Sequence, residues 1–63
     1  MLTERDVRLV AATALLDERT VSRVLIDGKR PKSKATMQRL IVALTDLGHA
    51  VTAHRLEKEL ACM

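Results

Sequence analysis

The stretch Val10–Leu25, VAATALLDERTVSRVL, decides the fold of this chain, and its second half has the pattern of a short amphipathic helix. Asp17 is a preferred N-cap residue, because its carboxylate can accept hydrogen bonds from the free backbone amides of Arg19 or Thr20. Its negative charge also suits the positive end of a helix. The sequence therefore predicts that a helix begins directly after Asp17.

The two sides of this helix differ in character. Leu16 and Val21 have the spacing of a hydrophobic staple, which fixes the direction in which the chain enters the helix. The helical repeat places apolar residues on one side (Val21, Val24 and Leu25) and polar residues on the other (Glu18, Arg19, Ser22 and Arg23). We expect the second side to present donors and acceptors at the surface.

Helical patterns surround this segment, and no strand pattern is present. Thr3 and Asp6 form a T-x-x-D capping box, which predicts a helix over about residues 4–14. The helix after the Asp17 cap is expected over about residues 18–26, because Gly28 can adopt the left-handed conformation that ends helices. Residues 28–32, GKRPK, contain Pro31 and are expected to form an exposed loop.

Two further helices are expected in the second half of the chain. Ser33 caps the longer one, which ends at Gly48 and carries a broad apolar stripe (Met37, Leu40, Ile41, Leu44 and Leu47). Thr52 is expected to cap a short fourth helix, with Val51 and Leu56 as a second staple. An isolated helix of about ten residues is unstable, so the apolar side of the fourth helix needs a packing partner.

The chain has the size of one small all-α domain. A domain of 63 residues buries only about 60% of the surface that its unfolded chain exposes, so its core is marginal. Cys62 is the single cysteine, which excludes an intramolecular disulfide and suits a reducing compartment. We therefore expect oligomerisation or a bound partner to support the fold.

Positive charge is concentrated in the middle of the chain. Residues 19–39 contain seven basic residues and one acid, for a net charge of +6, whereas the remaining residues sum to −3. The basic residues flank the helix that follows Asp17 and its loop, which is the distribution expected for a surface that neutralises phosphates. The chain has no aromatic residue, and this argues against single-stranded nucleic acids bound by base stacking.

Other function classes find little support in the sequence. His49 and His54 have neither a cysteine nor a second carboxylate at ligand spacing, so we expect no metal site, no cofactor and no enzymatic activity. No apolar run approaches the roughly 18 residues of a membrane span, and we expect no signal peptide. Glu57 and Glu59 oppose binding of the last helix to anionic lipid. We expect a cytoplasmic, nucleoid-associated protein.

The stretch Val10–Leu25 resembles the helix-turn-helix headpiece of the LacI family of bacterial repressors. The family pattern, roughly V-A-x-x-A-G-V-S-x-x-T-V-S-R-V-L, aligns with it without a gap, and residues 20–24, TVSRV, are the specific part. The similarity extends over Ser33, Leu40, Leu44 and Leu47 and covers roughly residues 3–49, with about one extra residue in the loop. It implies a single helix-turn-helix DNA-binding domain, which we expect to cover residues 1–63, with three core helices over residues 3–48 and a C-terminal segment over residues 49–63.

The resemblance also implies a role for each matching position. Glu18, Arg19 and Arg23 match positions that reach base edges in the major groove of double-stranded DNA. Asp17, Thr20, Ser22, Ser33 and Lys34 match positions that lie against phosphates. The residue chemistry agrees, since Arg binds guanine in a bidentate manner and Glu accepts from cytosine. The loop residues Lys29, Arg30 and Lys32 are added to the phosphate contacts on the basis of their charge.

Three features depart from the family pattern. Leu15 stands where the family usually has Gly, which predicts a different turn or a longer first helix. Asp17 replaces Ser and brings a carboxylate near the phosphates. The effector-binding domain that follows in the family has no counterpart in this sequence, so no small-molecule effector domain is expected.

These observations predict a bacterial or phage transcriptional regulator, a repressor that acts by occupying a two-fold-symmetric DNA site as a homodimer. The apolar residues of the C-terminal segment are the candidate dimer interface (Val51, Leu56, Leu60 and Met63). The alternative is a small helical protein-interaction module, such as an antitoxin, an anti-repressor or a recombination accessory factor. A neutral or acidic surface around residues 18–34 would favour that alternative.

Overall fold

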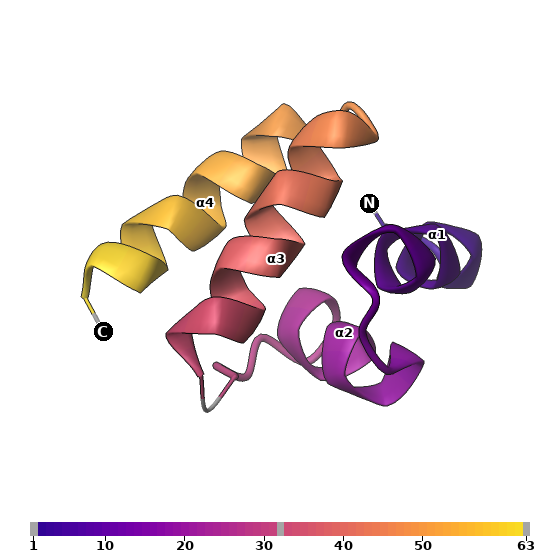
Figure 1. The fold of residues 1–63 in the computed structure, drawn as a ribbon, viewed down its shortest axis with the longest axis horizontal. Helices are drawn as coiled ribbons and strands as arrows, with labels where there is room; N and C mark the ends of the chain where they lie inside the picture. The colour runs from indigo at the N-terminus through magenta and orange to yellow at the C-terminus, as the bar shows by residue number, and fades with distance from the viewer. Residues whose placement is uncertain (1, 32, 63) are drawn as a thin grey trace.

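The computed structural model describes residues 2–31 and 33–62, and all regular structure in this part of the chain is helical. Helices α1 (Glu4–Ala14), α2 (Glu18–Leu25), α3 (Lys34–Asp46) and α4 (Ala50–Ala61) follow one another with short connections. α1 packs against both α2 and α3, and α4 packs along α3 on the other side of the molecule (Figure 1). The predicted all-α helix-turn-helix fold is confirmed.

The first three helices begin where the sequence predicts. The Thr3 hydroxyl accepts from the Asp6 amide at 3.4 Å and the Asp6 carboxylate accepts from the Thr3 amide at 2.9 Å, which completes the capping box. The Asp17 carboxylate accepts from the Arg19 amide at 2.8 Å, and the Ser33 hydroxyl accepts from the Ala35 amide at 3.2 Å. Each cap satisfies amides that the first turn of a helix leaves without a partner.

The predicted start of α4 is wrong. His49 precedes the helix without a side-chain cap, and Thr52 lies inside the first turn. Val51 is 86% exposed whereas Leu56 is 1% exposed, so the two do not form a staple. The cause is a Schellman turn at the end of α3, in which the His49 amide donates to the Leu44 carbonyl at 2.7 Å. Gly48 has φ +86° there and directs the chain straight into α4.

α1 ends with the same hydrogen-bond pattern, but without a glycine. The Leu16 amide donates to the Ala11 carbonyl at 2.9 Å, and the Leu15 amide donates to the Ala12 carbonyl at 3.4 Å. Leu15 has the left-handed conformation, with φ 58° and ψ 43°, and its side chain is 85% exposed. Leucine at this position therefore still forms a left-handed turn, and α1 does not continue beyond it.

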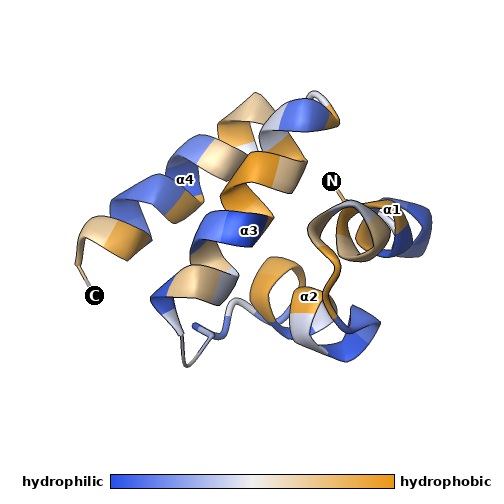
Figure 2. Ribbon diagram, in the orientation of Figure 1, coloured by the Kyte–Doolittle hydropathy of each residue, from blue (hydrophilic) through white to orange (hydrophobic). Residues whose placement is uncertain are grey.

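The core contains residues from all four helices. Figure 2 shows the hydrophobic segments of α1, α2 and α3 gathered around the centre of the molecule. Ala53 and Leu56 of α4 belong to the same core, which therefore extends beyond the expected residues 3–48. The largest fully buried side chains are Val10, Val21, Met37, Leu40, Leu44 and Leu56.

Candidate nucleic-acid interface

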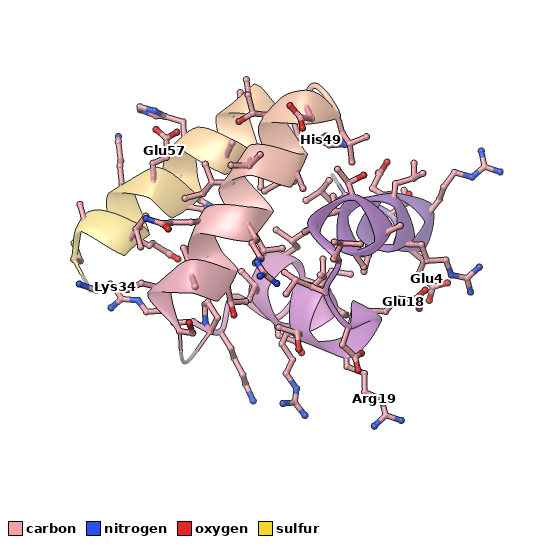
Figure 3. All side chains as sticks on the ribbon, viewed as in Figure 1. Glu4, Glu18, Arg19, Lys34, His49 and Glu57 are labelled. Carbon is pink, nitrogen blue, oxygen red and sulfur yellow. The ribbon has the colours of Figure 1, made fainter. Side chains whose placement is uncertain are left out.

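The outer side of α2 carries the residues predicted to read bases. Glu18, Arg19 and Arg23 are exposed, and together with half-buried Ser22 they line a groove between α1 and α2. Arg19 projects away from the body of the protein at the beginning of α2 (Figure 3). The apolar side of α2, which carries Val21, is buried in the core as predicted.

A second groove lies between α2 and the beginning of α3. Five residues predicted to contact DNA line it: Thr20, Arg23, Lys29, Arg30 and Ser33. Arg23 lines both grooves, so the two form one continuous surface. Lys34 is exposed at the start of α3, while Lys32 lies outside the described residues. We call this combined area the α2–α3 surface.

The loop after α2 folds back towards the helix and brings its cations to this surface. The Lys29 amide donates to the Arg23 carbonyl at 2.9 Å, and Gly28 has φ +73° at the bend. A left-handed conformation favours glycine, since it carries no Cβ. The turn therefore holds the Lys29 backbone close to the end of α2.

Two of the predicted phosphate contacts already serve as helix caps. The Asp17 carboxylate accepts a hydrogen bond from the Arg19 amide at the start of α2. An ionised carboxylate has no hydrogen to donate to a phosphate. The Ser33 hydroxyl accepts from the backbone, which leaves its own hydrogen available for donation. Ser33 can therefore bind a phosphate by donating a hydrogen bond, whereas Asp17 would repel it.

An ion pair between α1 and α2 was missed by sequence reasoning. The Arg8 Nε atom lies 4.0 Å from the Glu18 Oε1 atom, and Glu4 lines the same groove. Both side chains of the pair are exposed, so its contribution to stability is under about 1 kcal/mol. The capping box and helical repeat locate α1, but only its packing against α2 decides which of its charges lies beside Glu18. Arg8 thus joins the α2–α3 surface as a further cation.

The predicted dimer residues do not form one exposed apolar side. Leu56 is buried in the core of the single chain, and Leu60 is partly buried against that core. Val51 is exposed, and Met63 lies outside the described residues. The assignment of Leu56 to a dimer interface is wrong, because α4 packs this residue against the rest of its own chain.

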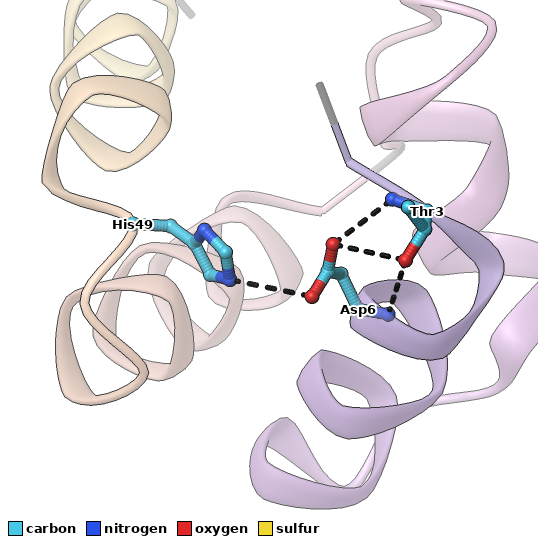
Figure 4. A network of polar contacts seen from close by, with 3 residues as sticks. All are labelled: Thr3, Asp6 and His49. Carbon is cyan, nitrogen blue, oxygen red and sulfur yellow. Dashed lines mark hydrogen bonds and ion pairs between the residues drawn. The ribbon is translucent and has the colours of Figure 1, made fainter.

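A polar contact joins the start of α1 to the turn between α3 and α4 (Figure 4). The His49 Nε2 atom lies 3.9 Å from Asp6 Oδ1, while Asp6 Oδ2 accepts from the Thr3 amide and hydroxyl. The hydrogen bonds from Thr3, and to a lesser extent the charge of His49, hold the pKa of Asp6 below its ordinary value of 3.8. In Figure 3 His49 lies in the upper part of the molecule, whereas Arg19 lies at the bottom and Lys34 at the left side.

Within residues 2–31 and 33–62, no group of three or more His, Cys, Asp or Glu side chains is arranged to hold a metal ion. The helices in the same ranges are too short or too polar to cross a membrane.

No protein-family model matches the chain, and no curated protein or solved structure matches it either. The α2–α3 surface is therefore the feature from which a function is inferred.

Proposed function

We propose that this domain binds double-stranded DNA in a sequence-specific manner and acts as a bacterial or phage transcriptional regulator by occupying its site. The observation that supports this most directly is the arrangement of the α2–α3 surface. The polar side of α2 lies next to a cationic loop and the start of α3, so that base-reading and phosphate-binding chemistry share one surface. Such a division between base contacts and backbone contacts is typical of DNA-binding proteins.

The dimensions of α2 suit the major groove. An α-helix with its side chains is about 10–12 Å across, and the major groove of B-DNA is about 12 Å wide, so a helix such as α2 can lie in it. Arg19 and Arg23 carry bidentate donors for guanine, and Glu18 carries acceptors for the cytosine amino group. Arg8 partly neutralises the Glu18 carboxylate, which reduces its repulsion from the phosphates.

A selection of bound duplexes from a random library tests this proposal. At about 0.1 M salt, we expect enrichment of a short motif that contains guanine at the positions read by Arg19 and Arg23. A variant with both arginines changed to Ala should give no motif, while Arg55→Ala, which lines a separate depression beside His49, should give the same motif as the wild type. Recovery of unenriched random sequence by the wild type would contradict sequence-specific binding.

A protein-interaction module is the second candidate, and one observation favours it. Leu15 and Val42 are exposed apolar residues that line one groove away from the α2–α3 surface. Failure of the wild type to bind any duplex would favour this candidate over DNA binding.

A further inference from the structure

A groove away from the α2–α3 surface has no part in the proposed DNA contacts. It lies between the end of α1 and the outer side of α3, and its large exposed apolar residues are Leu15 and Val42, which are 85% and 60% exposed. Arg39 and Asp46 of α3 line the same groove. We call it the Leu15–Val42 groove.

Leu15 is an unfavourable residue for a free surface in two respects. Its left-handed backbone costs about 1–2 kcal/mol in a residue that has a Cβ, and its apolar side chain is left in water. A partner that covers Leu15 would offset the second of these costs.

The outer side of α3 has a regular seam. Ala35, Arg39, Val42 and Asp46 follow one another at intervals of four, three and four residues, which places them in a single stripe along the helix. Ala35 is small and allows another helix to approach closely. Neither Arg39 nor Asp46 forms an ion pair with any other described residue.

The order of charges in this seam is self-complementary. Arg39 and Asp46 lie on either side of Val42, so two antiparallel copies of α3 bring Val42 against its counterpart and Arg39 of each copy against Asp46 of the other. A parallel arrangement would place like charges together instead. An interface between identical chains needs this kind of self-complementary surface.

We propose that the Leu15–Val42 groove binds a second copy of this chain, with the two α3 helices antiparallel. The contact involves one helix side and a flanking residue, so it is smaller than the roughly 1,200–2,000 Å² of a stable complex, and the dimer forms weakly and reversibly. Because α3 begins at the α2–α3 surface, an antiparallel pair places its two α2–α3 surfaces at opposite ends. The dimer would therefore join two separate DNA sites and would not lie on one symmetric site.

Sedimentation equilibrium without DNA tests the proposal independently of the proposed function. For the wild type we expect the mean mass to rise above the 7.0 kDa of the monomer as the concentration approaches about 1 mM, the range of weak association. Val42→Glu should abolish this rise. Val51→Glu, at an exposed residue of α4 that does not line the groove, should leave it unchanged.

A charge exchange tests the antiparallel geometry. Arg39→Asp and Asp46→Arg should each weaken association several-fold, and the double variant should restore it, because the exchange re-forms both pairs with the total charge unchanged. Circular dichroism of each variant checks that the helices are retained. A wild type that stays monomeric at about 1 mM would overturn the proposal, and so would a double variant that associates as weakly as the single variants.

Discussion

Leu15 performs the same backbone function as Gly48, at the end of a different helix. Both residues have positive φ in a turn in which the following amide donates to a carbonyl of the last helical turn. The left-handed conformation costs about 1–2 kcal/mol more for leucine than for glycine. Glycine in turn increases the entropy of the unfolded chain, which offsets about 0.4–1 kcal/mol.

We therefore predict that Leu15→Gly stabilises the protein by about 0.5–1 kcal/mol, since the exposed side chain contributes little packing. Urea unfolding measures this difference. Gly48→Ala is the matched control and should destabilise the protein by about 1 kcal/mol, because alanine is strained at the positive φ of this residue. A Cβ at that position meets no atom within 4 Å, so no steric clash adds to this cost. Reduced stability of Leu15→Gly would show that the leucine side chain is packed.

Asp6 gives the stability a dependence on acid pH. Its pKa is lowered in the folded state, chiefly by the hydrogen bonds from Thr3, so its contribution is present above the ordinary value of 3.8. This contribution disappears as the pH falls through the lowered pKa of the folded state. Asp6→Asn should thus show a smaller decrease in thermal stability between pH 7 and pH 2.5 than the wild type.

Thr3→Ala should remove only part of this effect, because the backbone amide of residue 3 still donates to the carboxylate when the hydroxyl is absent. Thermal unfolding followed by circular dichroism across the pH range compares the three proteins. Identical pH profiles for Asp6→Asn and the wild type would contradict the role given to the capping box.

At the scale of the helix, α4 is a structural part of the domain. Leu56 is fully buried among residues of the other helices, and Ala53 of the same helix is buried as well. Leu56→Ala should cost about 2–4 kcal/mol by removing core packing, a large fraction of the stability of a small domain. Val51→Ala, at an exposed position of the same helix, should change stability by less than about 0.5 kcal/mol.

Urea unfolding at neutral pH distinguishes these two variants. Equal stability of Leu56→Ala and the wild type would mean that α4 does not pack against α3 in solution, and the C-terminal segment would then again be available to a partner.

The loop and the start of α3 are expected to bind DNA without reading it. Replacement of Lys29, Arg30 or Lys34 by Ala should weaken binding to all sequences alike and reduce the slope of log affinity against log salt by about 0.9 for each phosphate that is no longer neutralised. Arg55→Ala is the matched control, because it removes the same charge from the depression beside His49. Titrations at several salt concentrations measure the slope, and an unchanged slope in all three variants would show that these cations face away from DNA.

At the scale of the whole molecule, local signals in the sequence predict where most of the helices begin. They predict much less about how the helices pack against one another. The caps at Thr3, Asp17 and Ser33 depend on residues two or three positions away, so the sequence alone locates them. The start of α4 depends on the turn around Gly48, and this turn takes precedence over the capping preference of Thr52. The burial of Leu56 depends on the packing of α4 along α3, which no local pattern encodes.

Some features of the candidate site could likewise be predicted from the sequence, and others depend on how the helices pack. The polar side of α2 follows from the helical repeat, and the basic loop follows from composition. The ion pair of Arg8 with Glu18 depends on the packing of α1 against α2, as does the shared groove beside them. The self-complementary seam of α3 becomes recognisable only when Val42 is known to be exposed.

The measurement that tests DNA recognition by α2 most directly compares one variant on two duplexes. The affinities of the wild type and of Arg23→Ala are measured at the same salt concentration for the selected duplex and for a scrambled duplex. If Arg23 reads a guanine, the affinity of the variant falls about 5- to 150-fold, or about 1–3 kcal/mol, on the selected duplex and much less on the scrambled one. An equal decrease on both duplexes would contradict base reading by Arg23 and leave it as a phosphate contact.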